Sequence, residues 1–395
     1  MKVTFVSNYI NHHQIPVSDV LYRKLGDDYR FIETEPMARE RVNMGWNSDT
    51  SKIPYVLRYF EKEELCRGLI ADSDIVIFGG VDDEKYITDR IKSGKSVIRY
   101  SERLYKEGQW KAVSPRGLLK KYKDHTSNNK RDVYLLCSGA YVADDFNIVK
   151  AYPGKRFKWG YFPEFIENDG KKEKEDDCVN ILWAGRFLDW KNPFTPIDVA
   201  RKLKEENVNF RITMVGDGEC REDVEEEVAE EGLKDYFDFP GSMSPNEVRV
   251  RMMEADIYLF TSNYYEGWGA VLNEAMNSRC AVIASYAAGA TPFLMKHGYN
   301  GFIYKESSSN SEIAEYALKL CRDAGLRRKF GDNAYETIAK TWNPENAANC
   351  LYEFMVNLTE GKVTYQKDGP MSEAKVIRQR KMYKYLMENA DGCQN

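Results

Sequence analysis

The chain repeats one pattern: a short, almost continuously apolar run followed by a longer segment with helical periodicity. In the first half the apolar runs cover residues 2–7, 30–34, 74–78, 96–100 and 133–137. Apolar runs of four to six residues that alternate with helices indicate a parallel sheet with helices on both faces. The same pattern starts again in the second half, with runs at residues 179–183, 210–215, 237–239, 256–260 and 281–284.

Residues 168–177 interrupt the alternation because they contain no apolar side chain. We interpret them as a linker. The 395 residues also exceed the roughly 250–300 residues that one hydrophobic core serves. The predicted fold class is therefore α/β, with a Rossmann-like domain over residues 1–167 and a second Rossmann-like domain over residues 178–345. Residues 346–395 are predicted to form C-terminal helices.

Composition and cysteine spacing bear on the cellular compartment. With 43% hydrophobic and 30% charged residues, the chain is neither disordered nor of low complexity. No apolar run approaches the ~18–20 residues of a membrane span, and Met1 leads directly into a strand-like run, which predicts no transmembrane helix and no secretory signal. The eight cysteines include no C-x-x-C pair, and several lie in apolar segments. We expect reduced cysteines in a cytoplasmic protein.

Basic residues concentrate in one part of the first half. Residues 103–131 contain nine Lys or Arg against Glu107 and Asp124, although the whole chain has a net charge of −5. Such a segment attracts an anionic membrane, a nucleic acid or an acidic substrate, or it is an ordinary solvated helix face. Residues 118–123 and 375–381 mix basic and apolar positions at helical spacing. Peripheral contact with the inner face of a membrane is thus an open alternative. The overall acidity argues against nucleic acid as a partner.

The most informative loop follows the apolar run 256–260. Glu266 lies just before a predicted helix and Glu274 about one turn inside it. Two glycines beside Glu266 let the backbone approach a ligand closely, and the amides at the helix start are placed to receive an anion. Two carboxylates on either side of an anion suit a sugar nucleotide; in the alternative interpretation they only stabilise the helix dipole. The residues after Glu266 in this predicted site are Gly267, Trp268, Gly269, Ala270, Val271 and Leu272.

The loop after residues 179–183 supplies cations. Arg186 and Lys191 leave the carboxyl end of the domain's first strand, where ligands of parallel sheets bind. Spaced five residues apart, they are suited to flank a diphosphate.

These motifs appear in a familiar order. Gly185-Arg186…Lys191, Val215-Gly-Asp-Gly218, Pro240-Gly241 and Glu266-Gly-Trp-Gly-Ala-Val-Leu-Asn-Glu274 resemble retaining glycosyltransferases of family 4. The resemblance is strong over residues 178–345 and looser over 1–165. It implies the GT-B fold, two facing Rossmann-like domains with a cleft between them that holds the site. It also implies that the C-terminal helix crosses back onto the N-terminal domain.

The resemblance implies roles for individual residues. Arg186 and Lys191 would hold the diphosphate of a UDP- or GDP-linked sugar and stabilise the leaving nucleotide. Glu274 would accept hydrogen bonds from the ribose hydroxyls, and Glu266 would contact the donor sugar, with the amides that follow it on phosphate and sugar oxygens. The base would lie near Gly241, Ser242 and Met243. No D-x-D occurs at the strand ends, so we expect no cofactor and metal-independent transfer.

The N-terminal half departs from the family pattern. Many members place a histidine near the reacting carbon, whereas the run 96–100 continues here into Ser101-Glu102-Arg103. Glu102 is our candidate for that position, as a base or a partner of the sugar, unless it only pairs with a nearby arginine. His13 is the second candidate, as base or phosphate contact, unless it is structural. His297 is expected to be structural. Pro292-Phe293 replaces a Pro-Glu pair, so the resemblance supplies no donor contact there.

The predicted function is transfer of a sugar, with retention of configuration, from a nucleotide-diphosphate sugar to a polysaccharide or lipid-linked glycan acceptor. The first alternative is a sugar-nucleotide epimerase or hydrolase, which needs acid and base groups at the sugar. The chain has only four histidines to serve as such groups, which makes that alternative weaker. A non-catalytic scaffold is disfavoured because Arg186 and Glu266 are both present.

Overall fold

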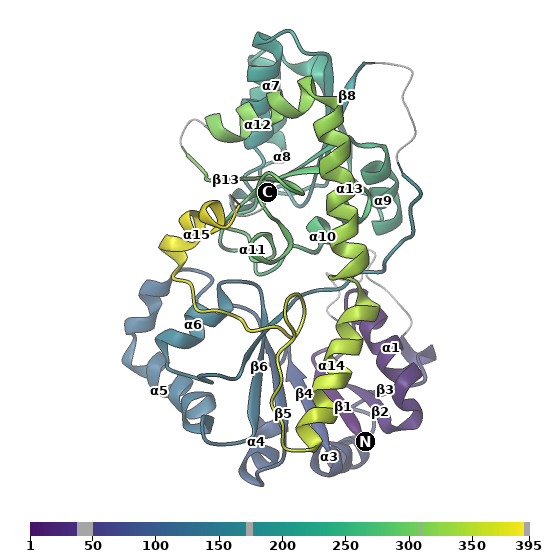
Figure 1. The fold of residues 1–395 in the computed structure, drawn as a ribbon, viewed down its shortest axis with the longest axis vertical. Coiled ribbons are helices and arrows are strands. Elements are labelled where there is room, and N and C mark those ends of the chain that lie inside the picture. Colours follow the sequence, from purple (N-terminus) through teal and green to yellow (C-terminus); the bar gives the residue numbers. More distant parts are fainter. Residues whose placement is uncertain (38–49, 171–176, 308–309, 391–395) are drawn as a thin grey trace. The chain divides into compact units, whose positions relative to one another are not determined.

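The computed structural model describes residues 1–37, 50–170, 177–307 and 310–390, which form two compact units (Figure 1). Unit 1 contains residues 1–164 and 341–379, and unit 2 contains residues 165–340 with the chain from residue 380. Unit 2 therefore begins before the predicted linker 168–177, and its first part ends at residue 340, five residues before the predicted boundary at 345. Of the predicted linker, residues 171–176 lie outside the described residues.

Unit 1 is built on a parallel sheet that, in the described residues, has seven strands in the order β3-β2-β1-β4-β5-β6-β7. The pairing registers agree with the apolar runs, since Val3 lies opposite both Tyr29 and Ile75. β3 and β7 were not predicted, because they are short and contain charged residues. The strands are β1 Val3–Ser7, β2 Tyr29–Glu33, β3 Val56–Arg58, β4 Ile75–Gly79, β5 Val97–Ser101, β6 Val133–Ser138 and β7 Arg156–Trp159.

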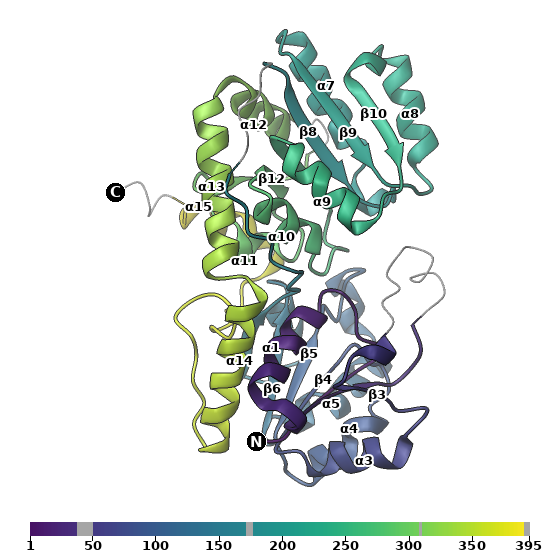
Figure 2. The same cartoon turned by 90° about the vertical axis from the view of Figure 1, so that its right-hand side faces the viewer.

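Helices cover both faces of this sheet. Figure 2 shows α1 and α14 on one face and α3 and α4 on the other. The unit 1 helices are α1 Ile15–Leu25, α3 Glu63–Asp72, α4 Lys85–Lys92, α5 Pro115–Asp124, α6 Val142–Ile148 and α14 Pro344–Thr359, with single turns η1 Gly26–Asp28, η3 Thr50–Lys52, η4 Gln109–Val113 and η5 Thr126–Asn128.

The C-terminal part of unit 1 closes one side of this fold. Helix α14 lies against α1, where Glu345 pairs with Arg23. The chain then runs along the edge strand β7: the Lys158 amide donates to the Ser372 carbonyl at 2.8 Å, and the Met371 amide donates to the Lys158 carbonyl at 2.9 Å. These bonds occupy backbone groups that an edge strand would otherwise expose.

The segment 375–381, predicted to be amphipathic and helical, is not a helix. Residues 375–378 have no regular structure, and only a single turn, η8 Gln379–Lys381, precedes helix α15 Met382–Glu388. The chain is held here by contacts of a different kind, because the Gln379 amide donates to an Asp144 carboxylate oxygen at 3.1 Å.

Unit 2 carries a second parallel sheet, ordered β10-β9-β8-β11-β12-β13 among the described residues. Alternate strand residues such as Ile181, Ile212 and Ile257 lie on one face of the sheet and form an apolar core with the helices that cover it. The residues between them, such as Leu182 and Tyr258, are buried on the other face. The bounds are β8 Val179–Ala184, β9 Phe210–Val215, β10 Phe237–Gly241, β11 Ile257–Phe260, β12 Ala281–Ser285 and β13 Gly301–Tyr304; α7 Thr195–Glu205, α8 Arg221–Glu230, α9 Pro245–Glu254, α10 Ala270–Asn277, α11 Thr291–Leu294, α12 Ser311–Arg322 and α13 Ala324–Lys340; with η6 Asp189–Lys191 and η7 Lys234–Tyr236.

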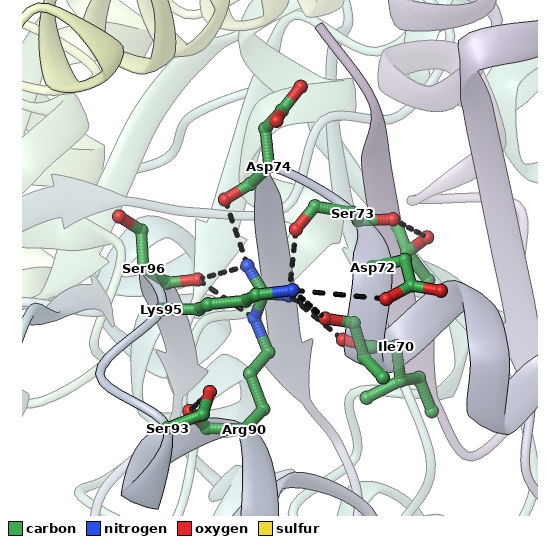
Figure 3. A network of polar contacts seen from close by, with 10 residues as sticks. Ile70, Asp72, Ser73, Asp74, Arg90, Ser93, Lys95 and Ser96 are labelled. Carbon is green, nitrogen blue, oxygen red and sulfur yellow. Dashed lines mark hydrogen bonds and ion pairs between the residues drawn. The ribbon is translucent and has the colours of Figure 1, made fainter.

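A buried arginine ties the amino ends of β4 and β5 to helix α3 (Figure 3). Arg90 on α4 is 4% exposed and donates to the carbonyls of Ile70 at 2.9 Å, Ser73 at 2.8 Å, Asp74 at 2.8 Å and Ser96 at 2.9 Å. Burial lowers the pKa of this guanidinium to about 10. A guanidinium remains charged at neutral pH even so, and its fork satisfies several carbonyls at once.

We expect Arg90→Ala to destabilise the protein by about 3 kcal/mol, because several buried carbonyls lose a charged donor together. Arg90→Lys restores charge but not the fork, and should recover less than half of that loss. Urea unfolding measures both variants. Arg131→Gln, which removes a single bond to the Ile91 carbonyl, is the matched control. Equal stability of Arg90→Ala and wild type would refute the structural role.

The predicted basic segment 103–131 is only partly a surface. Arg103 is buried and forms a bidentate pair with Asp145, from Nε to Oδ2 at 3.1 Å and from Nη2 to Oδ1 at 3.0 Å. Its charge is therefore neutralised inside unit 1, contrary to the expectation that it adds to an exposed patch. The exposed basic residues lie on and around α5. None of the described helices is both long and apolar enough to cross a membrane.

Candidate functional site

The residues predicted for the donor site come together at the carboxyl edge of the unit 2 sheet. β8 and β11 are hydrogen-bonded neighbours at the centre of this sheet, so the loops that follow them are adjacent. The loop after β8 carries Arg186 and Lys191, and the loop after β11 carries Glu266. Arg186 is exposed, whereas Lys191 and Glu266 are largely shielded from solvent.

Three hydrogen bonds join these two loops, two of them through side chains that the sequence analysis did not single out and the third between backbone groups. The Asn192 side-chain amide donates to the Thr261 carbonyl at 2.9 Å, and the Thr261 hydroxyl donates to the Lys191 carbonyl at 2.5 Å. The Asn263 amide donates to the Trp190 carbonyl at 3.0 Å. The backbone that carries Lys191 is therefore fixed against the Glu266 loop before any ligand binds.

Lys191 and Glu266 form an ion pair. The Lys191 ammonium contacts Glu266 Oε2, and the Ser262 hydroxyl donates to the same oxygen at 3.2 Å. Their side chains are only 14% and 13% exposed, so water screens the pair weakly. The ammonium also lies 4.5 Å from the centre of the Trp190 ring. A cation held beside a carboxylate at this edge is placed to exchange that carboxylate for an anionic ligand.

Close backbone contacts between neighbouring loops shape this edge. A Cβ on Gly216 would lie 1.9 Å from the Gly185 carbonyl oxygen, and a Cβ on Gly289 would lie 1.8 Å from the Gly267 carbonyl oxygen. Only glycine permits loops to approach this closely. Gly216, in the motif Val215-Gly-Asp-Gly218, and Gly289, outside the named motifs, are thus both required by packing between loops.

The start of helix α10 differs in one respect from the prediction. Gly269 has a left-handed conformation with φ 93°, and the Leu272 amide donates to its carbonyl at 2.9 Å. Leu272 was predicted to offer a free amide to an anion; that prediction is wrong, because the turn closed by Gly269 uses it. Ala270 and Val271 occupy the first two helical positions, where amides have no partner within the helix.

Glu274 lies further along α10 and is strongly desolvated. Burial raises the pKa of its carboxyl to about 7, and the charge of Arg249 on α9 opposes that rise. Arg249 is buried and donates to the Asn277 side-chain oxygen at 2.6 Å. Glu274 is therefore poised between its neutral and ionised forms near neutral pH.

The residues predicted to lie near a base occupy the end of the edge strand β10. Gly241 has φ 85°, and its carbonyl accepts the Gly216 amide at 2.9 Å. Ser242 is exposed and Met243 is half-buried. β10 lies two strands from β8, because β9 is between them. The three residues therefore lie at the same edge of the sheet as the loop of Lys191.

In unit 1, Glu102 and His13 meet a residue that the sequence analysis missed. Tyr161 follows β7, and its hydroxyl contacts Glu102 Oε1. The His13 ring stacks on the Tyr161 ring, with centroids 5.5 Å apart and planes 7° apart. The ionic partner of Glu102 is Lys106, four residues away, and not the arginine considered above.

Tyr161 is held in a desolvated position. Burial and the charge of Glu102 raise its pKa well above the ordinary value for tyrosine. It therefore acts as a hydrogen-bond donor to Glu102 at neutral pH. The alternation of basic and apolar residues in β7, followed by Gly160, is the sequence signal that could have located Tyr161, but it extends over only four residues.

Two other predictions concern histidine and metal ligands. His297 Nδ1 accepts the Ile303 amide at 3.1 Å, which is a structural role. Within the described parts of the chain, no three His, Cys, Asp or Glu side chains group as a metal site. Metal independence remains a prediction.

Glu306 is a further carboxylate that the sequence analysis missed, because β13 was not predicted. It accepts a hydrogen bond from the Ser285 hydroxyl at 2.8 Å, and burial raises its pKa. Ser285 and Asn192 oppose part of this rise in pKa, and Asn192 lies on the loop that carries Lys191.

Sequence comparison places unit 2 beside known transferases. Residues 164–337 match the family model described as "Glycosyl transferases group 1". An uncharacterized glycosyltransferase of Methanocaldococcus jannaschii, MJ1069, is 30% identical over 202 residues, 49% of this chain and 50% of that protein. The 2-deoxystreptamine N-acetyl-D-glucosaminyltransferase of Niallia circulans is 24% identical over 48% of this chain and 47% of its own length. The putative colanic acid biosynthesis glycosyltransferase WcaL of Salmonella typhimurium is 24% identical over 42% of each. The chain spans about half the length of the curated relatives it matches.

Structural comparison covers both units. The crystal structure of Anabaena HepE in complex with UDP has a TM-score of 0.66 and 15% identity, covering 90% of this chain and 100% of that chain. The lipopolysaccharide outer core galactosyltransferase WaaB, in its apo form, has a TM-score of 0.65 and 17% identity over 89% of this chain and 99% of its own. TarM has a TM-score of 0.65 and 10% identity over 90% of this chain and 98% of its own. These likenesses confirm the predicted fold class, two Rossmann-like α/β domains of the GT-B type.

Proposed function

We propose that this protein is a glycosyltransferase that moves a sugar from a nucleotide-diphosphate sugar to a polysaccharide or lipid-linked glycan acceptor, with retention of configuration and without a metal ion. The observation that carries the proposal is the Lys191–Glu266 ion pair at the carboxyl edge of the unit 2 sheet, beside the start of α10. The family-model match over residues 164–337, and the UDP in the HepE complex, support a donor of this chemistry.

The cations serve the leaving group. In the transfer, the bond between the sugar C1 and the β-phosphate oxygen breaks, and negative charge grows on the departing diphosphate. The Thr261 bond fixes the backbone of Lys191 at the edge of the sheet, and Arg186 on the same loop carries an exposed guanidinium. We assign both cations to the growing charge of the diphosphate. Charges placed in advance stabilise the transition state without reorganising at the moment of reaction.

Glu266 exchanges partners in this mechanism. In the ligand-free protein it neutralises Lys191. A diphosphate that pairs with Lys191 releases the carboxylate, which then accepts hydrogen bonds from hydroxyls of the donor sugar. The exchange makes sugar recognition depend on the arrival of the diphosphate, because Glu266 does not pair with Lys191 and bind the donor sugar at the same time.

Acceptor chemistry is proposed for the cluster in unit 1. The acceptor hydroxyl must lose its proton as the new bond to C1 forms. Glu102 is a carboxylate whose oxygens contact Tyr161 and Lys106, with His13 stacked on Tyr161. We assign this cluster to the acceptor, with Glu102 and His13 as the groups that orient or deprotonate it.

The proposal is tested by binding and by transfer. A thermal-shift series with UDP-, GDP- and dTDP-sugars should identify one base, since a ligand at 100 times its Kd stabilises the protein by about 2.7 kcal/mol. The preferred donor then enters a mass-detected transfer assay, with and without EDTA. Unchanged turnover in EDTA supports metal independence. Absence of binding to every nucleotide would overturn the proposal, and free or epimerised sugar formed without acceptor would favour an epimerase or hydrolase.

Glu274 gives a pH prediction of defined sign. Its pKa is about 7 in the folded protein against 4.5 ordinarily, so the folded state holds this proton more tightly. The stabilisation is complete below pH 4.5 and is lost as the pH rises to 7, a change of about 3 kcal/mol at 1.4 kcal/mol per pKa unit. Glu274→Gln lacks this loss, so its thermal midpoint relative to wild type should rise between pH 5 and pH 8.

The affinity for the donor should depend on pH in the opposite direction to the stability, so that it increases as the pH rises. An ionised Glu274 accepts both ribose hydroxyls, so wild-type affinity for the nucleotide sugar should fall several-fold as the pH drops from 8 to 6. The Gln variant should bind more weakly at pH 8 and without this dependence. Nucleotide sugars are the suitable ligand because their diphosphate does not titrate in this range. If the affinity of wild type and of Glu274→Gln for the nucleotide sugar changed in parallel with pH, the assignment of Glu274 to the ribose would be contradicted.

A further inference from the structure

Unit 1 presents large apolar side chains to solvent on α5 and the turn η4 that precedes it. Trp110 is 70% exposed, Val113 79%, Leu119 57% and Tyr122 56%. No residue of α5 is buried. We call the following set the α5 surface: the apolar residues Trp110, Val113, Leu118, Leu119 and Tyr122 and the basic residues Arg116, Lys120 and Lys123.

The orientation of α5 is the reverse of that of an ordinary surface helix. Its partly shielded positions are Gly117, Lys121 and Asp124, spaced four and three residues apart, and these face the body of unit 1. Leu118, Leu119 and Tyr122 lie on the exposed side. A helix that serves only the core of unit 1 would bury its leucines and expose its lysines. Core packing therefore does not explain this sequence.

Positive charge borders the apolar side chains. Arg116, Lys120 and Lys123 are exposed and are spaced four and three residues apart, so they share one side of the helix next to Leu119. The neighbouring acid Glu107 is paired with Lys111. Apolar and aromatic side chains next to a row of cations are the composition of helices that lie in the interface of a membrane.

We propose that the α5 surface binds an anionic lipid bilayer, with Trp110, Leu119 and Tyr122 entering the headgroup region and the three basic residues meeting anionic headgroups. Charge complementarity selects this partner. In a symmetric dimer of this chain the same surface faces itself, which would bring Arg116, Lys120 and Lys123 next to their own copies. The headgroups of an anionic bilayer can contact all three basic residues at once. This binding does not depend on the proposed transfer reaction.

The full-length protein is tested by co-sedimentation with vesicles of phosphatidylcholine containing one-third phosphatidylglycerol, and with phosphatidylcholine alone. Wild type should pellet with the anionic vesicles at low salt, and much less at high salt or with neutral vesicles. The double variant Leu119→Ser with Tyr122→Ser should lower the partition coefficient at least 10-fold. The triple variant Arg116→Gln, Lys120→Gln and Lys123→Gln should lower it about 100-fold.

The matched control removes the same charge elsewhere on unit 1, at exposed Lys24, Lys62 and Lys92, and should change binding less than 3-fold. Because α5 contains no buried residue, every variant should keep its thermal midpoint within a few degrees. The proposal is overturned if wild type does not pellet at low salt, or if the control loses as much binding as the α5 triple variant. A concentration-dependent dimer that Leu119→Ser disrupts would instead assign the surface to self-association.

Discussion

Replacing Lys191 with methionine should lower kcat for sugar transfer by about 100- to 1000-fold, the loss seen when one preorganised group is removed from a developing negative charge. Methionine keeps the volume of the apolar stem but has no charge. No neighbouring cation should take over the position of the Lys191 ammonium. The Lys191 backbone is fixed by Thr261, and its ammonium lies 4.5 Å from the centre of the Trp190 ring. Steady-state kinetics with the preferred donor measures the effect.

Two variants separate charge from geometry at this position. Lys191→Arg keeps the charge on a longer, planar group and should recover only part of the activity. Lys234→Met, at an exposed lysine of the turn η7 in the same unit, is the matched control and should retain full activity. A Lys191→Met enzyme with kcat within 3-fold of wild type would remove Lys191 from the mechanism.

Glu266→Ala should abolish transfer while strengthening the binding of the free nucleoside diphosphate. In the ligand-free protein this carboxylate occupies Lys191, so a diphosphate must displace it. Alanine removes the competitor, and we expect up to about 10-fold tighter binding of the product nucleotide by calorimetry. Transfer falls at least 100-fold, because the sugar loses the acceptor of its hydroxyl hydrogen bonds.

The predicted loss of transfer together with tighter nucleotide binding distinguishes this mechanism from a structural role. A purely structural role for Glu266 would weaken nucleotide binding and lower the thermal midpoint together. We expect the midpoint to fall by only a few degrees, because Glu266 forms one ion pair and one bond to Ser262, and the shielded Lys191 ammonium keeps the Trp190 ring beside it in the variant. Glu266→Gln is the conservative variant: it should bind nucleotide like Glu266→Ala and retain a small residual activity. Weaker nucleotide binding in both variants would falsify the exchange mechanism.

Much of the candidate site followed from local sequence. Apolar runs such as 256–260 place the loops of Glu266 and Lys191 after strands, and the carboxyl edge of a parallel sheet then brings such loops near each other. The prediction failed where a signal was short or depended on packing. β3, β7 and β13 have three or four residues each, so Tyr161 and Glu306, which follow two of them, were missed.

The sequence alone determined the two alternations of strand and helix and the loops that carry the candidate residues, because hydrophobic periodicity and glycine placement are written in neighbouring residues. Only the tertiary structure decided which of these side chains meet. Lys191 pairs with Glu266 across 75 positions, and Tyr161 contacts Glu102 across 59. It also buried Arg103 against Asp145 and turned the leucines of α5 outward. Such pairings depend on strand order and on which face of each element is covered, and neither quantity is local to any stretch of the chain.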